Sequence, residues 1–333
     1  MLVAIRRLLT VLVIAVCVAS CSAGTESASQ GASNTGDASL VPSETSFPVQ
    51  TGTEVDGILR WSVMEPHGIG FGFGAVWVSG HHSESVFRID PSTNELTDEL
   101  SGPSTQAQDV LVAFDSLWVP ATGGPMARMD QDGTVLETLP TTYSDAEAGF
   151  GSVWAVSTEN QLDQISPESN EVTRSSTVGS GGVDYNNSVA VGESFVWVAV
   201  PDDAKVLAFD PASGDQVADV DVGGPGLIAA GPAGIWVALE DGTLLQVDEQ
   251  SRAITTSVET GSEGYNLVEV GEDAIWFAGA DQVLRTYDAD GAELGQIYLS
   301  WPPEGLLIAE GSAWVEEYGM DRVERIDLDP SSE

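Results

Sequence analysis

The sequence predicts an all-β protein, a single seven-bladed β-propeller, and three observations predict it. First, an apolar residue followed by tryptophan recurs seven times, at intervals of 36 to 43 residues. A repeat near forty residues with short β-type segments is typical of a four-stranded propeller blade. Second, each tryptophan is followed 12 or 13 positions later by a turn residue. Third, an unused strand precedes the first blade, and the last blade lacks one. The tryptophans are Trp77, Trp118, Trp154, Trp197, Trp236, Trp276 and Trp314, and the turn residues are Asp90, Asp130, Ser166, Asp210, Asp248, Asp288 and Asp327.

Each repeat contains four segments with different compositions. The first is short and rich in small residues, as in "GIGFG", "LIAAG" and "LVEVG", and we expect it to line the central channel, where blades crowd together. The second carries the tryptophan, the third ends at the turn residue, and the fourth is polar and alternating, as in "NELTDEL". This order predicts four antiparallel strands that run from the channel to the rim.

The repeated tryptophans are best explained by packing between neighbouring blades. Each indole buries about 200 Å², which contributes on the order of 5 kcal/mol at ~25 cal/mol per Å² as an upper bound. Such packing can replace disulfide bonds, because Cys17 and Cys21 are the only cysteines and both precede the repeats.

The turn residues predict self-capping turns, in which an Asp side chain accepts hydrogen bonds from its own turn. A calcium site in "DADGAE" (Asp288 to Glu293) is the alternative. The same turn recurs in nearly every blade, and the later ligands of an EF-hand loop are missing, so the structural interpretation is favoured.

Ring closure is also predicted. The chain ends at "VERIDLDPSSE", so the seventh blade has no fourth strand of its own. The segment Val55 to Val63, "VDGILRWSV", is the unused strand and would complete that blade, leaving no open edge.

The N-terminal segment has the pattern of an export signal. Arg6 and Arg7 precede an apolar run of 12 residues, which is too short to span a bilayer as a stable helix. The sequence Val18-Ala19-Ser20-Cys21 resembles a bacterial lipobox, and this resemblance implies cleavage before Cys21 and lipid attachment to it. An ordinary small-residue cleavage site is the alternative. We therefore predict a signal peptide at 1–20 and a lipid-anchored protein on the extracytoplasmic face of a bacterial cell membrane.

Residues 21–52 are expected to be a flexible linker, and residues 53–330 the propeller. The linker is rich in Ser, Thr, Gly and Ala and cannot bury enough apolar surface to offset its ordering entropy. Random-coil scaling gives it a reach of roughly 30 Å.

The formal charge of −41, with Lys205 as the single lysine, excludes nucleic acid as a partner, because such a surface repels phosphate backbones. Contact with an anionic membrane is disfavoured too, so the lipid must provide the anchor. The acidity fits solubility in high salt, and it also fits binding of cations or basic partners. We expect a monomer.

The loops between blades and between the second and third strands share one face around the channel mouth. All three histidines of the chain fall in these loops, together with aromatic, acidic and amide side chains that suit a sugar, a peptide or a cationic ligand. The predicted partner is a cell-surface protein, a peptide or a carbohydrate. The alternative is that any large loop face collects such groups. The candidate ligand-binding residues are Glu65, His81, His82, Tyr143, Tyr185, Asn186, Tyr265, Asn266, Trp301 and Glu304.

The sequence Glu65-Pro66-His67 stands just before the first blade. Here the chain resembles the streptogramin B (virginiamycin B) lyase family of seven-bladed propellers. The resemblance covers residues 53–330 through the repeated "G…(V/I)W(V/F)…(R)xD" pattern, which YVTN and NHL-like propellers share. It implies a Mg²⁺-dependent carbon–oxygen lyase, with Glu65 as metal ligand and His67 as general base. His81 stands where the family has a second acidic ligand, and Glu304 stands where it has a further histidine. His67 as a hydrogen-bonded loop residue is the alternative.

Other catalytic signatures are absent from the sequence. There is no G-x-S-x-G motif, no Cys/His zinc spacing, and "GIGFGFG" opens no helix that could bind phosphate. Three hypotheses remain: a non-enzymatic binding module, which we favour; a metal-assisted lyase that uses Mg²⁺ or Ca²⁺; and a purely structural surface protein.

Overall fold

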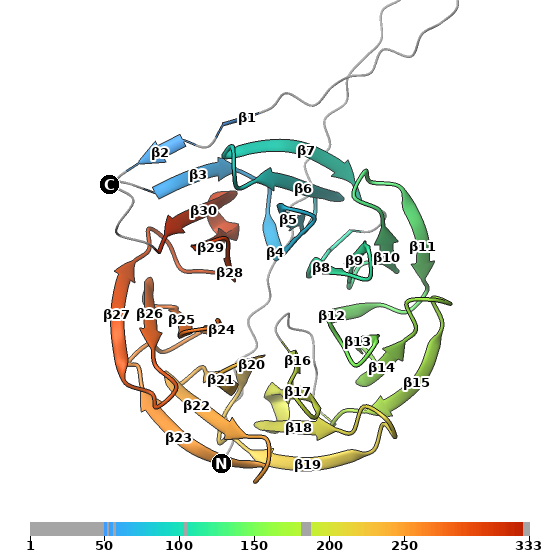
Figure 1. Ribbon diagram of the computed structural model, residues 1–333, viewed down its shortest axis with the longest axis vertical. Helices are drawn as coiled ribbons and strands as arrows, with labels where there is room; N and C mark the ends of the chain where they lie inside the picture. The colour runs from blue at the N-terminus through green and yellow to red at the C-terminus, as the bar shows by residue number, and fades with distance from the viewer. Residues whose placement is uncertain (1–49, 52, 56–57, 103–104, 181–187, 329–333) are drawn as a thin grey trace, which may run out of the picture. The chain divides into compact units, whose positions relative to one another are not determined.

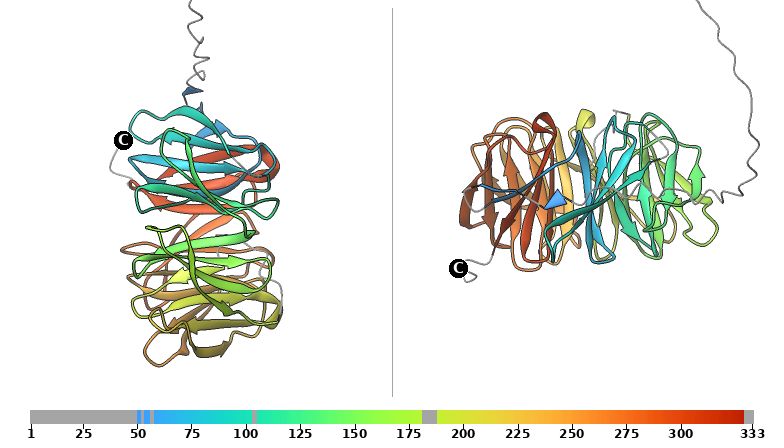
Figure 2. Two further views of the ribbon diagram at one scale, coloured as in Figure 1. Left: turned by 90° about the vertical axis from the view of Figure 1, so that its right-hand side faces the viewer. Right: turned by 90° about the horizontal axis from the view of Figure 1, so that it is seen from above.

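The computed structural model describes residues 50–51, 53–55, 58–102, 105–180 and 188–328. In this part of the chain, seven antiparallel sheets are arranged in a ring around a central channel, as Figure 1 shows. Seen from the side, the sheets form a thick disc (Figure 2). The prediction of a seven-bladed propeller is confirmed. The predicted signal peptide, Cys21 and nearly all of the linker lie outside the described residues.

Each blade has four main strands from the channel to the rim, and they follow chain order in every blade but the last. The innermost strands are β4 (Pro66–Gly72), β8 (Leu111–Ala113), β12 (Tyr143–Gly149), β16 (Val189–Val191), β20 (Gly226–Gly231), β24 (Leu267–Val270) and β28 (Gly305–Ala309). The second strands are β5 (Ala75–Gly80), β9 (Ser116–Val119), β13 (Ser152–Ser157), β17 (Val196–Val200), β21 (Gly234–Leu239), β25 (Ile275–Gly279) and β29 (Ser312–Glu317). The third strands are β6 (Ser85–Asp90), β10 (Met126–Met129), β14 (Gln161–Ile165), β18 (Lys205–Phe209), β22 (Thr243–Asp248), β26 (Val283–Tyr287) and β30 (Arg322–Asp327). The outer strands are β7 (Glu95–Ser101), β11 (Val135–Leu139), β15 (Val172–Thr177), β19 (Gln216–Asp221), β23 (Ala253–Glu259), β27 (Glu293–Tyr298) and β3 (Ile58–Ser62).

The last blade is closed by a strand from the beginning of the chain, as predicted. Strand β3 pairs antiparallel with β30, with Trp61 opposite Val323. Two short strands extend the sheets further than the sequence predicted. Strand β1 (Gln50–Thr51) pairs with β7 of the first blade, and β2 (Thr53–Val55) pairs with β3 of the last. These two sheets therefore have five strands, and their outer edges are covered where the chain enters the ring.

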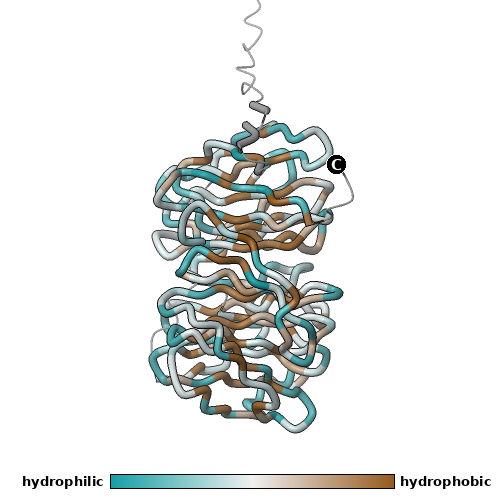
Figure 3. Tube along the Cα trace, turned by 90° about the vertical axis from the view of Figure 1, so that its left-hand side faces the viewer, coloured by the Kyte–Doolittle hydropathy of each residue, from teal (hydrophilic) through white to brown (hydrophobic). Residues whose placement is uncertain are grey.

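The repeated tryptophans pack between blades. Trp77 of the first blade contacts the cluster of Leu117 and Val119 in the second, and Trp197 of the fourth contacts Ile235 of the fifth. Six of the seven are fully buried, and Trp276 is partly buried. The predicted packing role is confirmed, and Figure 3 shows the corresponding hydrophobic stretches along the strands, with hydrophilic residues in the turns.

In two blades, an arginine of the third strand contacts the next blade. Arg128 lies over the indole of Trp118, 4.8 Å from its ring centroid, and donates hydrogen bonds to Pro167 O and Asn170 Oδ1 of the following blade. Arg325 does the same between the seventh blade and the first, at Pro91 O and Asn94 Oδ1. The Arg of the "RxD" pattern is thus an inter-blade contact in these two blades.

The turn residues cap their own turns. Asp210 Oδ1 accepts the amides of Ala212 and Ser213 at 2.8 and 2.9 Å, and these hydrogen bonds lower the pKa of Asp210. In "DADGAE", Asp288 Oδ1 accepts the amides of Asp290 and Ala292 in the same way. The structural interpretation of this turn is confirmed.

The only helical elements in the described part are two single turns, η1 (Pro201–Asp203) and η2 (Tyr318–Met320). Neither they nor any other described segment forms a helix that is long and apolar enough to cross a bilayer.

Candidate functional site

The candidate site lies at one end of the first blade. Because β4 and β5 run antiparallel, the residues before β4 and after β5 lie at the same end of the sheet. Glu65 precedes β4 and His81 follows β5, and the His81 amide donates to Glu65 O at 2.8 Å. Glu65 has a positive φ of 48°, which L-residues rarely adopt. Its conformation is held by contacts on both sides, since its amide donates to Asp321 Oδ1 of the last blade.

The three histidines converge at this end of the channel. The ring centroids of His67 and His81 are 4.6 Å apart, and those of His81 and His82 are 4.3 Å apart. Tyr318, which begins η2 in the last blade, lies edge-on to His67 and to His81 at 6.1 Å. Two blades that meet at the closure of the ring therefore contribute to one cluster.

Burial keeps the inner two histidines neutral near pH 7. Desolvation, with a smaller contribution from the neighbouring His81, lowers the pKa of His67 to about 4. Desolvation also lowers the pKa of His81. Their Nδ1 atoms lie 3.3 Å from Gln108 O and 3.2 Å from Ala107 O, so each neutral ring can donate Nδ1–H to a backbone carbonyl.

Glu65 binds the outer histidine. Its Oε2 accepts the amide of His82 at 3.1 Å and lies 3.2 Å from His82 Nδ1. Among the described residues, no three or more His, Cys, Asp or Glu side chains are arranged to hold a metal ion. Mg²⁺ also prefers oxygen ligands, whereas imidazoles surround Glu65 here. The residues present do not fit the metal that the family resemblance implies.

A cavity of about 370 Å³ lies along the innermost strands, which the sequence predicted to line the channel. Its charged lining residues are Asp109, Asp145, Glu147 and Glu269, which come from the second, third and sixth blades. A Cβ on Gly68, next to His67, would collide with the backbone of Asp109, so this acid lies directly beside the histidine cluster.

The carboxyl groups of the cavity are harder to ionise than ordinary ones. Burial, with repulsion from neighbouring acids, raises the pKa of Glu147 and of Glu269 to about 7. Burial and repulsion from Asp145 raise the pKa of Asp109 well above its usual range. Asp145 is better accommodated, although burial still raises its pKa. Its Oδ2 accepts the backbone amides of Ser188 and Val189, both at 2.7 Å.

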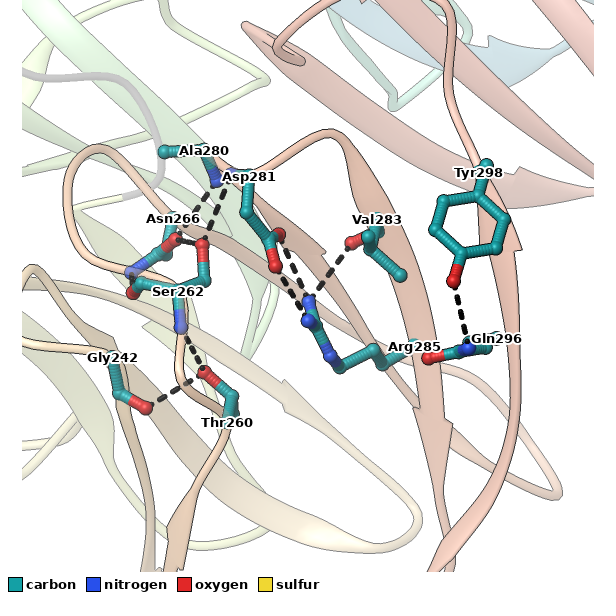
Figure 4. A network of polar contacts seen from close by, with 10 residues as sticks. All are labelled: Gly242, Thr260, Ser262, Asn266, Ala280, Asp281, Val283, Arg285, Gln296 and Tyr298. Atoms are coloured by element: carbon teal, nitrogen blue, oxygen red, sulfur yellow. Dashed lines mark hydrogen bonds and ion pairs between the residues drawn. The ribbon is translucent and has the colours of Figure 1, made fainter.

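Two of the predicted ligand-binding residues lie in the protein interior. Tyr143 is fully buried, and its hydroxyl donates to Asp163 Oδ2 at 2.7 Å. Asn266 is 2% exposed and donates to Leu239 O. It also donates to Ser262 O and accepts the amide of Ala280, and Figure 4 shows it beside these two residues. Both side chains are engaged in connecting strands and loops, which is a structural role.

The remaining predicted residues are spread around the face. Trp301 is 44% exposed, Tyr265 is half-buried beside a small hollow lined by Pro201 and Glu240, and burial raises the pKa of the half-buried Glu304. Tyr185 and Asn186 lie outside the described residues. The structure thus brings Glu65, His67, His81 and His82 together.

Sequence reasoning did not select the channel acids as site residues. Asp109, Asp145 and Glu147 stand near blade entrances, and Glu269 stands within "LVEVG", a segment already expected to line the channel. A carboxylate inside a channel-lining segment was the available signal, because such a residue must face either the lumen or the packed joint between blades.

Comparison with known proteins places the fold among solved propellers. No family model and no curated protein matches the chain. A crystal structure of virginiamycin B lyase from Staphylococcus aureus has a TM-score of 0.67 and 14% identity, over 82% of this chain and 99% of that one. A streptogramin B lyase structure has a TM-score of 0.67 and 12% identity, over 84% and 97%. The chain has the seven-bladed fold of these lyases.

A third solved structure is also similar to the chain. BamB from Moraxella catarrhalis has a TM-score of 0.61 and 13% identity, over 81% of this chain and 90% of that one. At such identities the likeness concerns the fold alone, because one propeller architecture hosts many unrelated functions.

Proposed function

We propose that the chain is a lipid-anchored extracytoplasmic protein of a bacterial cell membrane whose propeller binds a ligand or protein partner at the channel mouth without catalysing a reaction. The observation that carries this proposal is the cavity of about 370 Å³, which adjoins the histidine cluster and is lined by four carboxyl groups among apolar side chains and strand backbone. A cavity of a few hundred Å³ is in the size range of small-molecule sites, and its predominantly polar surface suits a polar or charged ligand.

The histidine chemistry favours binding over catalysis. A general base works best when its pKa lies near the operating pH. The pKa of His67 is lowered to about 4, so the neutral ring has little affinity for a substrate proton. At the same time, an aromatic and imidazole cluster beside a cavity offers stacking faces and hydrogen-bonding groups that suit recognition.

The binding function is tested with the full-length chain in detergent micelles. Its thermal unfolding is measured against panels of oligosaccharides, short peptides and amines, because a ligand that binds the native state raises Tm. Trp301→Ala should reduce the shift, and Tyr298→Ala is the matched control, since that side chain is 71% exposed on the outer strand β27. If no compound in any panel shifts Tm, the protein is better explained as a purely structural surface protein.

Anchoring is supported by Arg6-Arg7, the apolar run and Val18-Ala19-Ser20-Cys21. It is tested by metabolic labelling of the full chain with a clickable fatty acid. The label should appear on the wild type and be absent from Cys21→Ser. Labelling that persists in Cys21→Ser would contradict attachment at this residue.

A metal-assisted lyase is the second candidate, favoured by the convergence of His67, His81 and Tyr318 beside Glu65. The test is turnover of a cyclic depsipeptide lactone in the presence of Mg²⁺. Turnover that is lost in His67→Ala and in Glu65→Ala would replace the binding proposal, whereas no turnover by the wild type would reject the lyase.

A further inference from the structure

The central cavity has an unbalanced charge. Figure 1 shows the innermost strands of the blades arranged around the channel. Two of them, β12 and β24, carry lining acids, and Asp109 lies just before a third, β8. The described lining includes Asp109, Asp145, Glu147 and Glu269 but no Lys or Arg. Carboxylates that lie this deep in a protein are ordinarily paired with a cation or a hydrogen-bond donor.

Most of these acids have little internal compensation. Asp145 accepts amides from the joint between the third and fourth blades and is therefore satisfied within the fold. The Oε1 of Glu147 accepts the amide of Ala148 at 2.9 Å. Glu269 and Asp109 are each stabilised by the backbone amide that follows them. Glu147, Glu269 and Asp109 are half-buried, and a single amide leaves each carboxyl group with unused acceptor capacity toward the lumen.

An independent observation comes from the last blade. Glu316 in β29 is 0% exposed, and neither of its carboxyl oxygens has a hydrogen-bond partner among the residues that the structure describes. Leaving such a group unsatisfied costs free energy of folding, and the cost is larger when the group is charged. In a native protein an orphaned buried carboxyl group therefore requires an explanation.

The Glu316 side chain lies over the innermost strand of its blade. Glu316 pairs with Gly305, the first residue of the innermost strand β28, and a Cβ on Gly305 would collide with Glu316 Oε2. The carboxyl group thus lies over the channel-side strand, in space that exists because residue 305 is glycine. Burial, with repulsion from Asp109, which lines the cavity, and from Glu304, raises the pKa of Glu316, so the three acids lie near one another.

We propose that the channel binds a small organic cation carrying amino or guanidinium groups, with Glu316, Asp109 and Glu269 as its carboxylate partners. This inference rests on the proposed binding function and names its ligand class. The acids come from three blades, and no described set of three could share one metal ion. A chain with two or more cationic ends can reach several of them, while its methylene groups contact apolar walls such as Ile228 and Leu306.

The test measures binding of putrescine, spermidine and agmatine to the full-length chain in detergent micelles by calorimetry. 1,4-Butanediol is the neutral probe of similar size, and sodium chloride at matched ionic strength controls for screening of the acidic surface. We expect saturable binding of at least one amine and none of butanediol. Glu316→Gln and Glu269→Gln should each weaken it about tenfold or more, as expected for loss of a charge-assisted hydrogen bond.

Glu259→Gln is the matched control, because this glutamate is exposed on the outer strand β23 and its loss changes the net charge equally. Gly305→Ala tests position rather than charge, since it displaces the Glu316 carboxyl group and should also weaken binding. If Glu316→Gln does not fold, Glu269→Gln decides the question alone. Amine binding that is equal in all variants would overturn the proposal.

The outcome also separates this inference from the proposed function. If the panels identify a sugar or a neutral peptide that binds while no amine does, the binding module stands and the cation site is rejected. If no compound of any class binds, both are rejected.

Discussion

The stability of this propeller should depend on pH in a way that single substitutions in the channel can reveal. The perturbation is Glu147→Gln. In the folded protein, burial and repulsion from Asp145 raise the pKa of Glu147 from 4.5 to about 7. Its Oε1 accepts the amide of Ala148, and a glutamine Oε1 can accept the same hydrogen bond. The substitution therefore removes the charge and retains the shape.

The sign follows from proton binding. Between pH 4.5 and 7 the folded state keeps a proton on Glu147 that the unfolded state has lost. The contribution of Glu147 to the free energy of unfolding therefore falls as pH rises through that window. A shift of this size is worth at most about 3 kcal/mol, at about 1.4 kcal/mol per pKa unit. As pH rises from about 4.5 to about 8, the free energy of unfolding of Glu147→Gln should therefore increase by up to about 3 kcal/mol relative to that of the wild type.

The assay is guanidinium unfolding of the wild type and the variant across this range. The wild-type profile alone is not decisive, because His67, with its pKa lowered to about 4, adds stability as pH rises through the same window. The difference between the two proteins removes that contribution. Glu259→Gln, which is exposed, should show no such dependence. A Glu147→Gln difference that is constant with pH would refute the claim that this carboxyl group is buried against other acids.

Three further outcomes are expected. Trp197→Ala should cost about 3 to 5 kcal/mol in guanidinium unfolding, and Trp276→Ala should cost less because its indole is only partly buried; equal costs would contradict the packing argument. Arg322→Met should lower the free energy of unfolding by about 3 kcal/mol, because it leaves the Glu317 carboxylate buried without its cation; an unchanged Tm would show that the pair contributes little. Asp210→Ala should cost about 1 kcal/mol through the loss of its turn hydrogen bonds, and a loss comparable to that of Trp197→Ala would mean that the turn does more than cap itself.

The blade architecture could be predicted because its determinants are local and repeated. A large indole at one topological position in every repeat has a single efficient use, which is packing against the next blade. A turn residue at a constant distance from it marks the end of the third strand. The two extra strands could not be predicted, because β1 and β2 are polar, short and near the start of the chain. Their pairing depends on outer edges that exist only once the ring is built.

The candidate site could be predicted only in part. Loop positions were sufficient to bring His67, His81 and His82 to one end of the channel. They were not sufficient to orient Tyr143 and Asn266. In a strand the side-chain direction reverses with every residue, and β12 has a register shift between Tyr143 and Asp145. A register shift of this kind changes which side chains face the core, and no sequence pattern predicted it.

The placement of the basic residues explains why the channel acids matter. The chain has 11 Lys and Arg, and only Arg6 and Arg7 lie outside the described residues. Each of the other nine has a partner elsewhere in the blades or their turns. Arg128 and Arg325 hold the next blade, and Lys205 pairs with Asp219. None lines the central cavity.

One arginine among the channel acids would stabilise them within the fold. The last blade has such an arrangement, in which Arg322 pairs with Glu317. Instead, neither carboxyl oxygen of the buried Glu316 has a hydrogen-bond partner in the described part of the chain, and neighbouring acids contribute to its raised pKa. Buried acids without an internal counterion cost stability above their pKa, so their position is most readily explained by a positive group that arrives from outside the chain.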